Sequence, residues 1–239
     1  MKATKIFGLI FIMLTAFLIA GCNDHFKVYI AKDPTSGKEF QVKLKDQFDK
    51  QPLPATVFNV NFFANPVSKN EEKIIDPNAH LTWYQIRQTF ARPLKVEFQN
   101  QFGKQQCELG EAAYLLVPTQ KMETGSAMPK KLNHFKAYKV LNSDELNKQA
   151  TLVDQFDRKL QQKENVIVGK LMFFCTPVAK NNEPIFDKSN HLAVYMIKSL
   201  GSEHLPKNIL IKNQFGLDSL YVEKSYMLAV PTKKLSYKE

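Results

Sequence analysis

Apolar and polar residues alternate in short runs along most of the chain. In the run HFKVYI, Phe26, Val28 and Ile30 fall on one face, and the histidine, lysine and tyrosine between them fall on the other. Alternation with a period of two residues is typical of half-buried β-strands. Later runs alternate in the same way and end at an Asp or Asn, which falls on the same face as the apolar residues. A Gln-Phe pair follows this Asp or Asn.

These runs recur four times in a fixed order. Each copy, about 55 residues long, contains a His-[Phe/Leu]-x-x-Tyr run, then Asp-Gln-Phe-Asp or Asn-Gln-Phe-Gly, then an apolar run ending in proline. We therefore predict three strands in each copy and twelve in all. The shared residues are His25, Tyr29, Asp46 and Phe48 in copy 1, His80, Tyr84, Asn100 and Phe102 in copy 2, His134, Tyr138, Asp154 and Phe156 in copy 3, and His191, Tyr195, Asn213 and Phe215 in copy 4.

The four copies also repeat in pairs. DQFD and NQFG alternate, so copies 1 and 3 match each other, as do copies 2 and 4. Residues 122–133 between copies 2 and 3 are small, polar and basic, which is typical of a linker. The prediction is an all-β chain with two tandem pseudo-symmetric domains, each a barrel or sandwich made of two copies, at residues 22–121 and 134–239.

Helix competes with strand in DQFDRKLQQK, residues 154–163. In the sister copies, Gly103 and Gly216 fall where such a helix would have to continue. We therefore expect a turn after each Gln-Phe pair.

The first residues resemble a lipoprotein signal. Lys2 and Lys5 precede an apolar run at 6–20, which is short for a membrane-spanning helix. The run ends in IAGC, which resembles the lipobox of bacterial lipoproteins. The resemblance implies a signal peptide at 1–21, cleavage before Cys22 and lipid on its sulfur, and the alternative is an ordinary cleaved signal. By the enterobacterial sorting rule, Asn23 implies the outer membrane. We expect a chain tethered to the bacterial cell envelope.

The chain is basic, with a formal charge of +10 that falls to +8 when Lys2 and Lys5 are removed. In the envelope, the expected anionic partners are glycans or an acidic protein, and nucleic acid is not expected. The lysines are scattered, as on an ordinary solvated surface.

Four His-Tyr pairs could indicate a site, because histidine titrates near neutrality and binds metals. Residues four apart in a strand lie about 13 Å from each other, however, and no metal-binding or catalytic spacing accompanies them. We predict a structural role, with no catalytic, cofactor-binding or metal-binding residue. Because Asp and Asn interchange before Gln-Phe, we expect an oxygen that accepts from a turn amide or from a repeat histidine.

Several single residues are expected to be structural. Cys107 and Cys175 are expected to be free thiols, with a disulfide between them as the alternative, and Cys175 to be a small buried residue. Trp83 is expected in the core, and His204 on the surface.

The motif order is similar to that of an uncharacterised tandem-repeat family of secreted bacterial proteins, with H-x-x-C-Y-K-V, D-Q-F-G and L-C-V-P motifs. The resemblance covers essentially the whole mature chain and implies fold and export, but no activity. It also implies cross-strand disulfides, which this chain lacks. The first cysteine positions hold Val28, Trp83, Ala137 and Val194, and the second hold Ala64, Leu116, Cys175 and Ala229.

The lost disulfides imply that each tyrosine-bearing strand lies beside the proline-terminated strand of its own copy. Ala137 should then face a residue near Leu116 or Cys175. For function, we expect a non-enzymatic binding or scaffolding lipoprotein. The alternatives are an envelope glycan-binding module, and an enzyme of unrecognised type.

Overall fold

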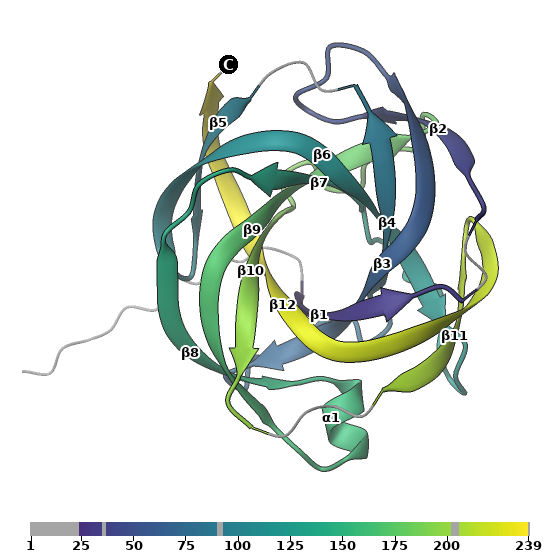
Figure 1. Cartoon of the computed structure of the whole chain (residues 1–239), viewed down its shortest axis with the longest axis vertical. Coiled ribbons are helices and arrows are strands. Elements are labelled where there is room, and N and C mark those ends of the chain that lie inside the picture. The colour runs from purple at the N-terminus through teal and green to yellow at the C-terminus, as the bar shows by residue number, and fades with distance from the viewer. Residues whose placement is uncertain (1–23, 35–36, 90–92, 202–205, 239) are drawn as a thin grey trace, which may run out of the picture.

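A computed structural model describes residues 24–34, 37–89, 93–201 and 206–238. This part of the chain contains twelve strands and one short helix, so the all-β prediction is confirmed (Figure 1). The elements are β1 (His25–Lys32), β2 (Phe40–Lys45), β3 (Leu53–Lys69), β4 (His80–Gln88), β5 (Leu94–Asn100), β6 (Gly103–Lys121), β7 (His134–Val140), β8 (Glu145–Val153), α1 (Gln155–Lys159), β9 (Glu164–Lys180), β10 (His191–Ser199), β11 (Lys207–Asn213) and β12 (Gly216–Lys238).

Eight of the strands pair in a closed antiparallel ring. The first strand of each copy pairs with the third strand of its own copy and with the third strand of the preceding copy. Copy 1 closes the ring, because β1 pairs with β12 of copy 4. Figure 1 shows this ring end-on. It is formed by β1, β3, β4, β6, β7, β9, β10 and β12.

The second strand of each copy lies outside the ring and connects copies that are two apart. β2 pairs with β9, β5 with β12, β8 with β3 and β11 with β6. The expected division into two domains at residues 122–133 therefore does not describe this sheet. Neither half closes a ring alone, because β1 needs β12 and β7 needs β6.

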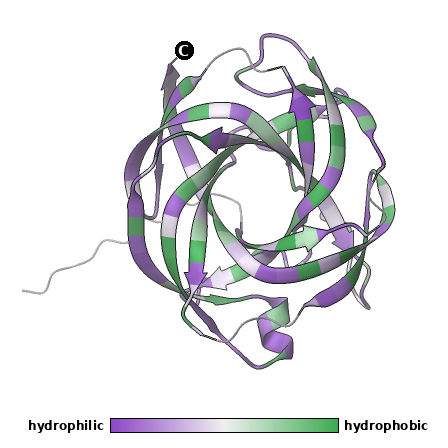
Figure 2. Cartoon of the chain, in the orientation of Figure 1, coloured by the Kyte–Doolittle hydropathy of each residue, from purple (hydrophilic) through white to green (hydrophobic). Residues whose placement is uncertain are grey.

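The core formed by the described residues consists of three apolar clusters. One takes residues from all eight ring strands, among them Phe26, Trp83, Phe135 and Leu192, and fills the inside of the ring. The other two lie on the opposite face of the same strands and include residues of the second strands, such as Leu44 of β2. Apolar and polar residues alternate along the ribbons (Figure 2). Both faces of the ring strands are thus buried, including the face of β1 that carries Lys27 and Tyr29.

The turn after each second strand differs between the copies. In copies 2 and 4, Gly103 and Gly216 have φ of 105° and 124°, and each pairs with the Asn that begins the motif. The two strands thus form a tight hairpin, because glycine adopts positive φ without a steric penalty. In copy 3, the DQFD motif instead begins α1, a single helical turn with Asp154 as its N-cap. The helical alternative for residues 154–163 is therefore correct over Gln155–Lys159.

Candidate functional site

The first residue of every second motif caps its own turn. One side-chain oxygen of Asp46, Asn100, Asp154 and Asn213 accepts the backbone N–H of the Phe two residues later, at 2.8 Å in each copy. This is the turn-amide acceptor that the interchange of Asp and Asn predicts, since only an oxygen is required. All four of these side chains are buried.

The second polar atom of each of these Asp or Asn side chains binds a tyrosine two copies away. The expected alternative, a hydrogen bond from a repeat histidine, is therefore wrong. Tyr138 donates to Asp46 at 2.7 Å, and Tyr29 donates to Asp154 at 2.8 Å. The Asn side chains donate in the opposite sense, from Asn100 to Tyr195 at 2.8 Å and from Asn213 to Tyr84 at 2.9 Å. Copies 1 and 3 exchange these contacts with each other, and so do copies 2 and 4.

Each repeat histidine binds the Gln of a different motif. His191 lies 2.7 Å from Gln47, His25 lies 2.9 Å from Gln101, and His80 lies 3.4 Å from Gln155. His134 makes the same contact with Gln214. The four histidines therefore share the contact with Gln, and the ring separates them rather than bringing them together.

Burial controls the ionisation of these side chains. Loss of solvent lowers the pKa of His25, His134 and His191 to about 4 and that of His80 to about 3, so all four are neutral at physiological pH. Burial also raises the pKa of Tyr84 and Tyr195 to about 12. Neutral histidines bound to Gln contribute hydrogen bonds and no positive charge.

The copies with DQFD also bury a lysine, which lies two residues after the histidine. Lys27 lies 2.8 Å from both Asp157 and Glu164, and Lys136 lies 2.6 Å from Asp49. In copies 2 and 4 the corresponding positions hold Thr82 and Ala193, and the opposing motif is the uncharged NQFG. DQFD thus occurs where the motif faces a buried lysine, and NQFG occurs where it faces an uncharged residue.

The carboxylates around Lys27 do not titrate alike. Burial alone would raise the pKa of Asp154, but Lys27 and hydrogen bonds from Asn65 and Tyr29 lower it overall. Burial and the neighbouring Asp154 raise the pKa of Asp157. The pKa of Lys27 is raised, because three carboxylates outweigh the effect of its burial. Lys27 is therefore held in its charged form inside the protein.

The cysteines and the tryptophan are buried. Cys107 and Cys175 are free thiols, as predicted, and burial raises the pKa of Cys107 to about 12. Cys175 is fully buried inside the ring and faces Ala137 across the β7–β9 pair. The lost disulfide positions of the other copies are direct partners too, which confirms the pairing within each copy. Trp83 is fully buried.

Cys22 and His204 lie outside the described residues. Within the part of the chain that the structure describes, no three His, Cys, Asp or Glu side chains come close enough together to hold a metal ion. The described segments also contain no helix that is both long and apolar enough to cross a membrane.

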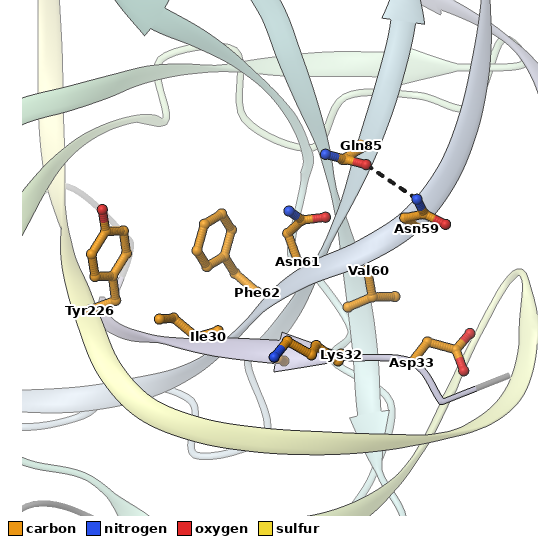
Figure 3. A pocket seen from close by; sticks show the side chains of 10 residues that line it. Ile30, Lys32, Asp33, Asn59, Val60, Asn61, Phe62, Gln85 and Tyr226 are labelled. Carbon is orange, nitrogen blue, oxygen red and sulfur yellow. Dashed lines mark hydrogen bonds between the residues drawn. The ribbon is translucent and has the colours of Figure 1, made fainter. Parts of the chain in front are cut away.

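An open groove lies at one corner of the ring, where copy 1 meets copies 2 and 4. It has a volume of about 660 Å³, and β1, β3, β4 and β12 line it. Phe62 and Tyr226 form an aromatic wall with nearly parallel rings, whose centroids are 6.0 Å apart. Figure 3 shows Asn61 next to Phe62, and Asn59 with Gln85 at the other end of the groove.

The four copies differ at the amide positions of the groove. Counted back from the proline of each third strand, Asn59 corresponds to Glu111, Lys170 and Lys224. Counted from the histidine, Gln85 corresponds to Ile30, Lys139 and Met196. At the next corner, Glu111 and Lys139 form an exposed ion pair of 2.5 Å instead of an amide pair. The repeat motifs do not include Asn59 and Gln85, because the motifs consist of residues that the copies share. These two positions are recognised only by the differences between the copies.

Comparison with known proteins agrees with the repeat. A family described as a repeat of unknown function (DUF7450) matches residues 80–232, from the histidine of copy 2 to the end of the proline motif in copy 4. The chain belongs to this family. No curated protein matches the chain, and no solved structure matches it. Family membership agrees with the expected uncharacterised tandem repeat and assigns no activity.

Proposed function

We propose that this protein is a lipid-anchored lipoprotein of the bacterial cell envelope with a non-enzymatic binding role, exercised at the groove where copy 1 meets copies 2 and 4. The groove is the observation that carries the proposal. The repeated polar residues are engaged with one another inside the fold, where they hold the four copies together. A binding role therefore belongs to a surface where the copies differ.

The anchor rests on the sequence. Lipid on Cys22 would hold the protein on a membrane, with the outer membrane favoured by Asn23. Its partners would then be envelope components, either a protein or a glycan, and not nucleic acid. The basic charge of the chain would favour an anionic component in weak long-range attraction.

Two measurements on the whole chain test the proposal. Cells expressing the wild type and Cys22→Ser are labelled with a clickable palmitate. We expect label and membrane association in the wild type only, and a variant that still carries label would refute the anchor. A photo-cross-linking amino acid is then placed at position 59 in the groove and, as the matched control, at position 170. We expect an adduct with an envelope component from position 59 alone. Equal adducts from both positions, or none, would refute the binding role.

The glycan-binding alternative has its own support in the aromatic wall and the amide side chains of the groove.

A further inference from the structure

The lining of the groove combines two kinds of chemistry. Phe62 and Tyr226, both partly buried, offer ring faces and edges, while Asn59, Asn61 and Gln85 offer amide groups. An amide both donates and accepts hydrogen bonds without carrying a charge. A sugar ring is the ligand with matching properties, because it has an apolar C–H face and a rim of hydroxyl groups that need both donors and acceptors.

The charges of the groove are balanced. Among the described residues that line it, the charged ones are Lys32 and Asp33, and Lys32 is bound to Glu223 at 2.6 Å. A site for a phosphate or a carboxylate needs an excess of positive charge or converging backbone amides. The balance favours a neutral ligand, although the chain as a whole is basic.

The repeat fold does not require these amides. The same positions hold Glu111 with Lys139 at the next corner, and Lys170 with Met196 at the corner after that. The contact between Asn59 and Gln85 is long, at 3.5 Å, and Asn59 is exposed. Gln85 also forms a side-chain hydrogen bond with Tyr114, so most of the hydrogen-bonding capacity left for a ligand lies with the exposed Asn59 amide.

We propose that the groove binds a neutral oligosaccharide. One sugar ring packs against the wall of Phe62 and Tyr226, and its hydroxyl groups bond to Asn59, Asn61 and Gln85. The groove volume of about 660 Å³ lies within the range of small-molecule sites. The assignment rests on the proposed binding role and adds the chemical class of the ligand.

The test uses the full chain in a detergent without a sugar headgroup, since a maltoside would compete for the groove. The probes are the tetrasaccharides of N-acetylglucosamine and of glucose, titrated by calorimetry and by saturation-transfer NMR. Tyr226→Leu and Asn59→Ala are compared with Met172→Leu and Lys170→Ala, which change the corresponding positions of copy 3. We expect saturable binding of at least one probe, weakened up to about tenfold by Tyr226→Leu and several-fold by Asn59→Ala, with both controls within twofold of the wild type.

Absence of saturable binding of both probes would overturn the sugar assignment, as would equal losses in the groove variants and their controls. Binding of a phosphorylated sugar or a peptide in place of the neutral probes would overturn it as well. The cross-linking experiment separates the two proposals. A specific adduct at position 59 without sugar binding refutes the ligand class only, whereas loss of both refutes the binding role itself.

Discussion

The hydroxyl of Tyr29 donates a hydrogen bond of 2.8 Å to the carboxylate of Asp154, 125 residues away in the chain. The same bond runs in the other direction between the same two copies, from Tyr138 to Asp46 at 2.7 Å. Copies 1 and 3 thus hold each other by a reciprocal exchange. A buried lysine accompanies each side of it, at Lys27 and Lys136.

Removing one of these lysines should be costly. Lys136→Ala leaves Asp46 and Asp49 without their buried cation, so we expect the free energy of unfolding to fall by about 3–5 kcal/mol. Chemical denaturation measures the change. Lys139→Ala is the control, because its ion pair with Glu111 is exposed and should contribute less than about 1 kcal/mol.

The contact between Lys136 and the DQFD motif of copy 1 also allows a rescue test. Copies 2 and 4 make the corresponding contact without charged residues. Lys136→Ala combined with Asp46→Asn and Asp49→Gly gives copy 1 the NQFG motif opposite an alanine, as Asn100 lies opposite the strand that carries Ala193. We expect the triple variant to regain at least half of the lost stability. A triple variant as unstable as Lys136→Ala would show that the alternation of charge does not specify the pairing of copies.

The pairing of Ala137 with Cys175 predicts a disulfide. In a Cys107→Ser background, Ala137→Cys should form a cross-strand bond with Cys175 under mild oxidation, since directly facing residues meet the distance requirement. Mass spectrometry under non-reducing conditions detects the linked peptides. The same protein with Cys175→Ala is the control, and two free thiols after oxidation would contradict the β7–β9 register.

The four repeat histidines predict a dependence of stability on pH. Their pKa values of about 3 to 4 in the folded protein lie below the unfolded value of about 6.5. Between these values the unfolded state binds more protons, so stability is fully present above pH 6.5 and falls as the pH drops toward 4. The maximum slope is about 1.4 kcal/mol per pH unit for each histidine.

NMR of the histidine ring protons checks this directly. We expect the repeat histidines to show constant chemical shifts from pH 8 to 5.5 in the folded protein. Titration of any of them with a midpoint near 6.5 would contradict its buried contact with Gln.

Trp83 predicts a spectroscopic signature, because it is the single tryptophan of the chain and is fully buried inside the ring. Its emission should be blue-shifted and protected from iodide until unfolding. Trp83→Ala should cost about 3–5 kcal/mol through the cavity that it leaves. Tyr221→Ala is the control, since Tyr221 is 40% exposed and its loss should change stability by about 0.5 kcal/mol or less.

The strands and their number follow from local patterns in the sequence. The alternation around Phe26 and Val28 and the turn residues Gly103 and Gly216 are local signals, and the structure agrees with them. The capping role of Asp46 was also accessible, because its acceptor bond spans two residues. The alternation of DQFD with NQFG was also visible in the sequence. Its cause, the buried lysine that faces each DQFD motif, was not.

Which copies meet could not be predicted from the sequence and depends on the tertiary structure. Tyr29 finds Asp154 because the ring closes through β1 and β12, and closure depends on pairings between distant strands that no local pattern encodes. The basic segment at 122–133 has the composition of a linker whether the two halves form separate sheets or a shared one. The groove likewise joins strands of copies 1, 2 and 4, and β12 of copy 4 becomes a neighbour of copy 1 only when the ring is closed.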